Sequence, residues 1–401
     1  MVTRSSIRHT REEFISSTPV RLVDEIIARA FTERASDIHF EPVGADCRIR
    51  IRTDGILIPG GRYSKLMHEE VISRLKVLAG LRTDIKFLPQ DGRFRVNLSN
   101  NSINIRISVV PSIHGEKGVL RLLPSTLQNH SLETLGFSLH NVGIISKNID
   151  VPHGMILVVG PTGSGKTTTL YTLLQKKSPS DVSTVTLEDP VEYSVPNITQ
   201  IPINTSMTYA NALRAVVRQD PDVIMVGEIR DHLTAELATH VALTGHLLFS
   251  TLHTNDAVTV LPRLIDMGVE PFLVASTVRM IISQRLVRKI CVTCKKEFEP
   301  SKIESEYLAS IGILSSNSKF KIYKGVGCAQ CKNTGYLGRT VLSETLIVDE
   351  KIKNKIMEKP SSDDLQKIAI EQGMVCLIKD AADKVINGIT TCEEIAAVCN
   401  V

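Results

Sequence analysis

One eight-residue stretch has residue types and spacing suited to binding phosphate. Residues 160–167 are GPTGSGKT, in which glycines precede a lysine and a hydroxyl residue. Backbone N–H groups of such a loop close around phosphate oxygens, Lys166 would reach the β- and γ-phosphates, and Thr167 would ligate Mg²⁺. An apolar segment precedes the stretch and a helical segment follows it, so it predicts a nucleoside triphosphate site. The residues predicted to bind the nucleotide are Gly160, Pro161, Thr162, Gly163, Ser164, Gly165, Lys166, Thr167 and Thr168.

Acidic residues follow two later apolar segments. Glu188, Asp189 and Glu192 follow the first, and Glu228 follows the second. Ligands of open α/β sheets bind beyond the carboxyl ends of the strands, where an acid can hold the Mg²⁺ shell or orient the attacking water. Gly227 stands where many P-loop ATPases have aspartate, so we expect Glu228 on the magnesium side and Glu192 beside the water. Alternatively, these acids are solvated loop residues with no role at the nucleotide. The division of roles between Glu192 and Glu228 stays open.

Histidines and arginines are further candidates for contact with the γ-phosphate. His246 and His253 bracket the fourth apolar segment, and either could sense the γ-phosphate, although a structural role is as common for a single histidine. Arg93, Arg106 and Arg121 lie in alternating segments nearer the N-terminus. Positive charge opposite the γ-phosphate accelerates hydrolysis, so these arginines could take part in the reaction. Alternatively, they form a solvated basic face of the strands.

Four of the eight cysteines form two CxxC pairs separated by 33 residues. This spacing suits a tetrahedral zinc site, in which four protein ligands leave no open position for catalysis. Free thiols and a redox pair are the alternatives, and the second is disfavoured because neither pair opens a helix of a βαβ unit. The predicted zinc ligands are Cys291, Cys294, Cys328 and Cys331.

Changes in hydrophobic pattern along the chain indicate the elements that must position these residues. An amphipathic helix and segments of period-two alternation predict a small α+β domain, and short apolar strands alternating with helices then predict a mainly parallel α/β domain. We predict an N-terminal tail (1–18), the α+β domain (19–124), a linker (125–140), the P-loop core (141–290), a tetracysteine module (291–340) and a C-terminal helical subdomain (341–401).

The composition indicates a folded protein and argues against two other classes. Of 401 residues, 42% are hydrophobic and 22% charged, and 47 basic against 43 acidic residues give a net charge of +4. This near balance argues against a dedicated nucleic-acid binder. We find no apolar run near the roughly 18–20 residues that span a bilayer. The start lacks the apolar region of a signal peptide, so we expect a cytoplasmic protein.

Four further motifs resemble those of a known family, the ATPases of bacterial type II secretion and type IV pilus assembly. The resemblance extends from about residue 18 to the end of the chain. Its motifs are similar to the family's second N-terminal domain marker (ASDIHFEP, 35–42), aspartate box (TLEDPVE, 186–192), arginine segment with an atypical Walker B motif (213–231) and histidine box (TGHLLFSTLHTNDA, 244–257).

The resemblance implies a hexameric ring of RecA-like ATPase domains that uses ATP, Mg²⁺ and Zn²⁺. Arg106 and Arg121 match the arginines that close on the γ-phosphate, and Arg214 and Arg218 match the arginine pair before the Walker B motif. It also implies a cytoplasmic motor, peripheral on the inner membrane, that pushes a platform protein and thereby extrudes pilin or pseudopilin subunits. The tetracysteine module is typical of the assembly and secretion branch and is generally missing from retraction ATPases.

The sequence departs from the family pattern in three respects. The motifs begin near residue 18, so we expect a short form without the family's first N-terminal domain, which docks onto a membrane-anchored recruitment protein. Leu233 stands where the family usually has glutamate, and Phe87 where a basic residue is common. Neither substitution touches the predicted phosphate site.

Two other functions fit part of the sequence. A RecA-like nucleic-acid motor shares the P-loop core, but it predicts a basic groove with aromatic residues, and the chain has no tryptophan. A scaffold that does not hydrolyse ATP is disfavoured because the candidate catalytic residues are all present: Lys166, Glu192, Glu228, Arg106 and Arg121. A motor of a competence pilus, which takes up DNA, belongs with the leading hypothesis and is not separated from it by the sequence.

Overall fold

The computed structural model describes residues 18–98, 101–124, 130–311 and 321–399. The chain divides into two compact units, residues 1–127 and 128–401. This boundary falls inside the segment 125–140 that we predicted as a linker. Residues 1–17 of the predicted tail and residues 125–129 of the predicted linker lie outside the described residues.

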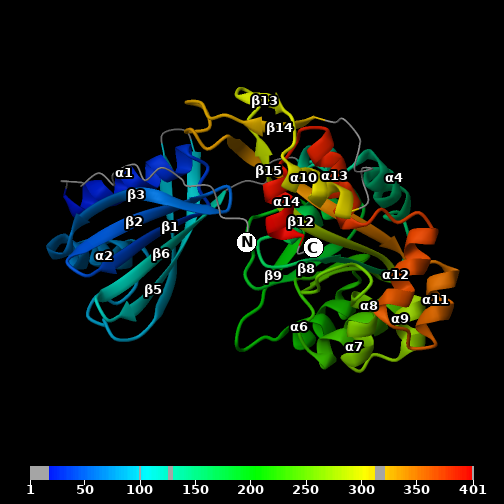
Figure 1. The fold of residues 1–401 in the computed structure, drawn as a ribbon. Helices are drawn as coiled ribbons and strands as arrows, with labels where there is room; N and C mark the ends of the chain where they lie inside the picture. Colours follow the sequence, from blue (N-terminus) through cyan, green and yellow to red (C-terminus); the bar gives the residue numbers. More distant parts are fainter. Residues whose placement is uncertain (1–17, 99–100, 125–129, 312–320, 400–401) are drawn as a thin grey trace. The chain divides into compact units, whose positions relative to one another are not determined.

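The first unit is an antiparallel sheet with the predicted N-terminal helix and a second helix, α2, that was not predicted from the sequence (Figure 1). Its strands are ordered β3-β2-β1-β6-β5-β4, and every paired neighbour is antiparallel. Thr18 caps the first helix, whose Pro19 sits where proline is well tolerated. The elements are α1 (Pro19–Thr32), β1 (Asp37–Val43), β2 (Asp46–Thr53), β3 (Ile56–Ser64), α2 (Lys65–Leu78), β4 (Gln90–Leu98), β5 (Asn101–Ser112) and β6 (Gly115–Pro124).

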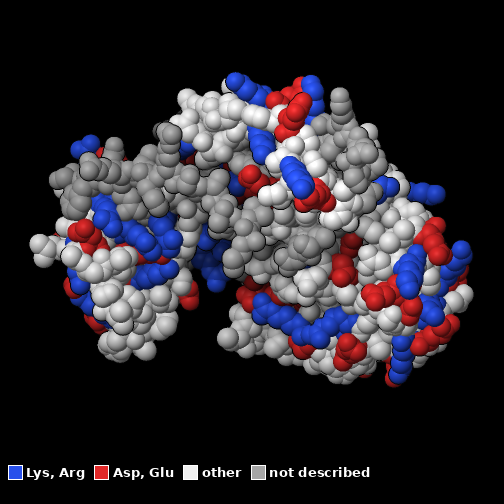
Figure 2. Space-filling model, viewed as in Figure 1, with Lys and Arg blue, Asp and Glu red and all other residues white. Residues whose placement is uncertain are grey.

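Alternation along these strands separates an apolar face from a basic face. Ile38, Ile49 and Ile105 are buried and belong to one core cluster with residues of α1 and α2. The residues between them point to the other side of the sheet. Figure 2 shows Lys and Arg side chains gathered over the strands of this unit.

The second unit is built on a seven-stranded sheet with the order β15-β12-β7-β11-β10-β8-β9. All neighbours are parallel except β12 and β15, which form a long antiparallel ladder. The predicted parallel core is therefore confirmed. The strands of this sheet are β7 (Gly154–Val159), β8 (Thr184–Glu188), β9 (Thr199–Pro202), β10 (Val223–Val226), β11 (Leu247–Leu252), β12 (Val278–Ile290) and β15 (Tyr336–Ile347), and a separate pair is formed by β13 (Lys295–Phe298) and β14 (Ile322–Gly325).

Helices connect these strands and follow the last of them (Figure 1). No helix among the described residues is both long enough and apolar enough to cross a bilayer. The helical elements are α3 (Leu132–Leu135), α4 (Leu139–Asn148), α5 (Lys166–Lys177), α6 (Tyr209–Val216), the 3₁₀ turn η1 (Val217–Gln219), α7 (His232–Leu243), α8 (Val260–Asp266), α9 (Pro271–Thr277), α10 (Lys302–Ser310), α11 (Glu350–Ile356), α12 (Ser362–Glu371), α13 (Leu377–Ile386) and α14 (Cys392–Val398).

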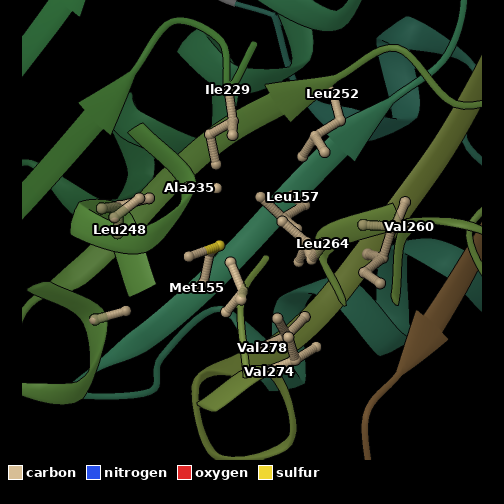
Figure 3. Packing of buried hydrophobic residues seen from close by; sticks show 14 of the residues in the cluster. Met155, Leu157, Ile229, Ala235, Leu248, Leu252, Val260, Leu264, Val274 and Val278 are labelled. Atoms are coloured by element: carbon tan, nitrogen blue, oxygen red, sulfur yellow. The ribbon is translucent and has the colours of Figure 1, made fainter. Parts of the chain in front are cut away.

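The main core of the second unit packs apolar side chains of the parallel strands against helices. Met155 and Leu157 on β7 and Leu248 on β11 lie in one cluster with Leu264 and Val274 from two helices (Figure 3). Every residue of β7 and β11 is buried. This packing holds the two strands rigidly, so the loops that follow them are fixed at their starting points.

Two predicted boundaries differ from the structure. The segment 130–140 contains α3 and the start of α4, because Ser131 and Ser138 each cap a short helix that its mixed composition had concealed. The predicted tetracysteine module ends inside β15, since this strand starts at Tyr336 and continues past the predicted boundary at 340. The module is thus continuous with the core sheet.

Candidate active site

The predicted phosphate loop and all four predicted acids meet in one pocket of about 420 Å³. Strands β7, β8, β10 and β11 are parallel, so the segments that follow them converge at one edge of the sheet. The predicted residues that line the pocket are Thr162, Gly163, Ser164, Gly165, Lys166, Thr167, Thr168, Glu188, Asp189, Glu192, Glu228 and His253. Gly160 and Pro161 form the start of the loop behind this lining.

The phosphate loop packs tightly against strand β12. Gly160 has φ +140°, and a Cβ atom there would lie 2.4 Å from the carbonyl oxygen of Gln284. Gln284 is fully buried, and its Nε2 donates a hydrogen bond of 2.7 Å to the carbonyl oxygen of Ser164. Glycine at 160 is therefore required by both backbone conformation and space.

Lys166 is held over the loop by backbone carbonyl groups. Its Nζ donates to the carbonyl oxygens of Gly160, at 2.8 Å, and Pro161, at 3.1 Å. Burial lowers the pKa of Lys166, and the negative charge of Glu228 opposes this effect. The pocket thus pairs a desolvated ammonium group with a nearby carboxylate, and the ammonium group can transfer its hydrogen bonds to phosphate oxygens.

Glu228 is the centre of the polar contacts on the opposite wall. Its Oε1 pairs with Arg230, and its Oε2 lies 3.3 Å from Nε2 of His253. Glycine precedes it for a steric reason: a Cβ atom at 227 would lie 2.9 Å from the hydroxyl oxygen of Tyr209 and 3.0 Å from the carbonyl oxygen of Leu187. A side chain at position 227 would displace the Tyr209 hydroxyl and crowd the backbone of β8, so Glu228 is the acid that the end of β10 supplies to the pocket.

Glu188 lines the pocket, but its oxygens already accept hydrogen bonds from the protein. Thr186 donates to Oε1 at 2.6 Å and Gln200 at 3.0 Å, while the Tyr171 hydroxyl donates to Oε2. Glu188 is 3% exposed. These contacts suit a residue that anchors the loop after β8, whereas Asp189 is exposed and Glu192 half-buried in the same pocket.

The structure does not bring His246, Arg214 or Arg218 into this pocket. His246 precedes β11, so the length of a six-residue strand, about 20 Å, separates it from the pocket edge, and it contacts the carbonyl oxygen of Val241. Arg214 and Arg218 are exposed on α6 and η1. The structure therefore does not place His246 in the nucleotide pocket of its own chain, because it precedes β11 and the pocket lies beyond the other end of this strand.

The predicted arginines of the first unit form a row across its sheet. Arg93, Arg106 and Arg121 are direct neighbours on β4, β5 and β6. Asp37 of β1 continues the row, and its Oδ1 lies 3.1 Å from Nε of Arg121. The row therefore presents several guanidinium groups on the face opposite the helices, with one of them fixed by a carboxylate. Phe87 in this unit is 73% exposed and Leu233 in the other 41% exposed, and neither lines the pocket.

Sequence reasoning missed several residues of the pocket lining. Tyr193 directly follows Glu192, and Tyr209 is the first residue of α6. Leu286 and Arg339 come from β12 and β15, whose pairing beside the phosphate loop links residues far apart in sequence. The only sequence signal for Arg339 was its position shortly after the second cysteine pair.

The four predicted zinc ligands form one cluster at the end of the β12–β15 ladder. Their Sγ atoms lie within 4.8 Å of one another, with three separations of 3.7 or 3.8 Å. Zinc–sulfur bonds of about 2.3 Å in a tetrahedron give sulfur separations of about 3.8 Å. Burial raises the pKa of Cys331, but N–H groups of Cys328 and Gly335 donate to its Sγ and hold the pKa below the usual value. The donor set therefore fits zinc.

Comparisons with known proteins find relatives along nearly the whole chain. The sequence profile described as Type II/IV secretion system protein matches residues 14–397. The chain is 42% identical over 388 residues to the type IV pilus assembly ATPase PilB of Thermus thermophilus, covering 96% of this chain and 43% of that protein. It is 41% identical over 381 residues to the type II secretion system ATPase E of Vibrio cholerae, covering 94% of this chain and 75% of that protein.

A solved structure shows the same fold. The X-ray structure of the Legionella pneumophila ATPase DotB matches with a TM-score of 0.71 at 21% identity, and the match covers 97% of this chain and 99% of that one. The match includes both units of the chain. The expected fold, a small α+β domain followed by a RecA-like P-loop domain, is therefore confirmed.

Proposed function

The chain belongs to the type II/IV secretion system protein family and is an ATPase, and we propose that it is the Mg-ATP-driven motor of pilin or pseudopilin assembly. The observation that carries the proposal is the single pocket in which Lys166, Glu228 and His253 converge beside the phosphate loop. The tetracysteine cluster supports the assembly direction, because it is the feature that the resemblance assigned to assembly and secretion motors.

Each part of the pocket has a proposed role in binding. Backbone N–H groups of the phosphate loop and Lys166 hold the β- and γ-phosphates, and Lys166 exchanges its two carbonyl partners for phosphate oxygens. Thr167 and Glu228 would hold Mg²⁺, which neutralises the charge that develops on the phosphates. The zinc site stabilises the module after β12 and takes no part in the reaction.

Hydrolysis requires a group that orients water and a group that stabilises charge. Glu192 accepts the proton of the attacking water, while His253 steadies the Glu228 carboxylate. Arg106 and Arg121 stabilise the charge on the γ-phosphate, and this contribution is worth roughly 10³–10⁵ in rate for such arginines. Arg214 and Arg218, which lie outside the pocket of their own chain, act on the nucleotide of a neighbouring copy.

These arginine roles imply an oligomer and partners. We propose a homohexameric ring that works at the cytoplasmic side of the inner membrane. There it drives a platform protein, and a membrane-anchored protein recruits it. The pilus assembly and type II secretion names of the relatives support this placement.

The direct test replaces Lys166 by alanine. Steady-state phosphate release should fall to background while the melting temperature changes little, because the Lys166 ammonium group is hydrogen-bonded to two backbone carbonyls of its own loop. Lys176→Ala on the same helix, whose Nζ contacts Ser146, is the matched control and should retain activity. In the source organism, Lys166→Ala should abolish surface pili or pseudopilin-dependent secretion. Retention of both processes would contradict the motor proposal while leaving the ATPase assignment intact.

A further inference from the structure

Strand β15 carries a buried carboxylate that joins two distant segments. Glu344 is 4% exposed. Its Oε1 accepts a hydrogen bond of 2.8 Å from the N–H of Ala257, and its Oε2 accepts one of 3.0 Å from the N–H of Leu377. Burial raises the pKa of Glu344, and the two N–H donors oppose this effect. A buried carboxylate is costly unless it is hydrogen-bonded, so its two partners are held firmly in place.

The first partner belongs to the loop that carries His253. Ala257 lies four residues after His253, so the chain between them spans at most about 14 Å. Before His253, the loop begins at β11, where Thr251 donates to the carbonyl oxygen of Gly227 at 2.8 Å. Arg285 of β12 donates to the carbonyl oxygen of Asn255 at 3.2 Å. The loop is thus fixed at one end by the strand before Glu228 and at the other by Glu344.

The second partner is the first residue of helix α13. The N-cap residue of this helix, Cys376, makes no side-chain cap hydrogen bond. Glu344 therefore accepts from an N–H group of the first helical turn that has no partner within the helix, and it places negative charge at the positive end of the helix. Further along α13, Asp380 accepts from the N–H of Ser343 at 2.9 Å, and Lys384 donates to the carbonyl oxygen of Val341 at 2.7 Å. Strand β15 and α13 are consequently one support.

We infer that Glu344 is a positioning residue for hydrolysis: its side chain, anchored by the N–H of Leu377, holds through Ala257 the loop that places His253 against Glu228. This inference rests on the proposed role of the His253–Glu228 pair in the reaction. Glu344 acts through His253 and touches neither the nucleotide nor the water. Its loss lets the loop shift, and the imidazole then no longer steadies the carboxylate.

The test is a double-mutant cycle on steady-state ATP hydrolysis by the full chain. Glu344→Gln should lower kcat about tenfold, as a small misplacement of a reacting group does, and leave the KM for ATP within about twofold. In a His253→Ala background, Glu344→Gln should cause no further loss of kcat. Glu344→Asp keeps the charge but is too short to reach both N–H groups, so it should lower kcat to a similar extent. It replaces Glu344→Gln in the cycle if that variant does not fold.

A matched control separates positioning from stability. Asp380→Asn combined with Lys384→Gln weakens the other contacts between α13 and β15 but leaves both hydrogen bonds of Glu344 in place, so the His253 loop stays held. It should lower the melting temperature as Glu344→Gln does and leave kcat unchanged. Equal loss of kcat on adding Glu344→Gln to wild type and to His253→Ala would overturn the inference alone. An unchanged kcat in His253→Ala would instead overturn the proposed role of His253, and the inference with it.

Discussion

The Nε2 atom of His253 lies 3.3 Å from Oε2 of Glu228, while Arg230 pairs with the other oxygen of the same carboxylate. These residues follow two adjacent parallel strands, β11 and β10. The pairing therefore results from strand order and not from nearness in sequence. It places a carboxylate of fixed orientation in the same pocket as Lys166.

Replacement of Glu228 by glutamine should weaken the use of Mg²⁺. The amide keeps the size of the side chain but removes the negative charge that would face the cation. The Mg²⁺ concentration for half-maximal hydrolysis should rise at least about tenfold, and kcat should fall by about 10²-fold or more. A Mg²⁺ titration of phosphate release measures both effects. An unchanged Mg²⁺ requirement would show that Glu228 is not on the magnesium side.

Replacement of Glu192 by glutamine should affect the chemical step alone. An amide cannot take a proton from water, so kcat should fall by about 10²–10⁴-fold with the Mg²⁺ requirement unchanged. The same titration, run beside Glu228→Gln, assigns the two carboxylates. If Glu192→Gln raises the Mg²⁺ requirement and Glu228→Gln does not, the two proposed roles are exchanged.

Arg121→Ala should slow turnover without weakening nucleotide binding to the phosphate loop. The guanidinium group is held by Asp37 on the open face of the first unit. Loss of charge stabilisation by one such arginine should lower kcat by about 10³-fold. Arg95→Ala on the same sheet face is the control, because the Arg95 guanidinium group donates to the Ser102 hydroxyl and lies outside the row of Arg93, Arg106 and Arg121. Comparable activity of the two variants would remove Arg121 from the reaction.

Acid should destabilise the first unit through Glu41. Burial raises the pKa of Glu41, but hydrogen bonds from Arg50, Lys117 and Arg48 outweigh it and lower the pKa to about 2. Because the folded-state pKa is lower than the unfolded one, the stabilisation is complete above about pH 4.5 and is lost as the pH falls towards 2. The shift corresponds to about 3 kcal/mol.

Amide hydrogen exchange of β1 and β2 measures the acid destabilisation caused by Glu41, once the exchange rates are corrected for the pH dependence of intrinsic amide exchange. Glu41→Gln should be less protected than wild type at neutral pH, and the difference should shrink on acidification. Glu69→Gln removes only an exposed ion pair with Lys86 and should show no such convergence. A constant difference between Glu41→Gln and wild type across the acid range would refute the linkage.

Cys331→Ser should remove the metal and loosen the module after β12. Wild type should contain about one zinc ion per chain, and the variant much less, because a tetrahedral site needs all four thiolates. Metal analysis measures the zinc content, and amide hydrogen exchange of β13 and β14 measures how far the module has loosened. Cys399 lies outside the cluster, so Cys399→Ser should keep the metal. Full zinc content in Cys331→Ser would exclude the four-cysteine site.

Sequence patterns predicted the parts of this protein that depend on local order. Alternation predicted both faces of the first sheet, and the phosphate loop was found from its glycines because Gly160 has neither the space nor the φ for a side chain. His246 lies outside the pocket of its own chain because residues at the two ends of one strand look close in sequence but lie at opposite edges of the sheet. Arg339 and Glu344 were missed because β15 reaches the site only by pairing with β12, a contact between distant segments.

We propose that the chain hydrolyses ATP as a ring in which arginines complete each site. Specific ATPase activity should be measured against protein concentration, with light scattering on the same samples. We predict that activity per chain rises as a six-subunit species forms, and that Arg121→Ala assembles without this rise. A monomer that hydrolyses ATP as fast per chain as the assembled species would contradict the account.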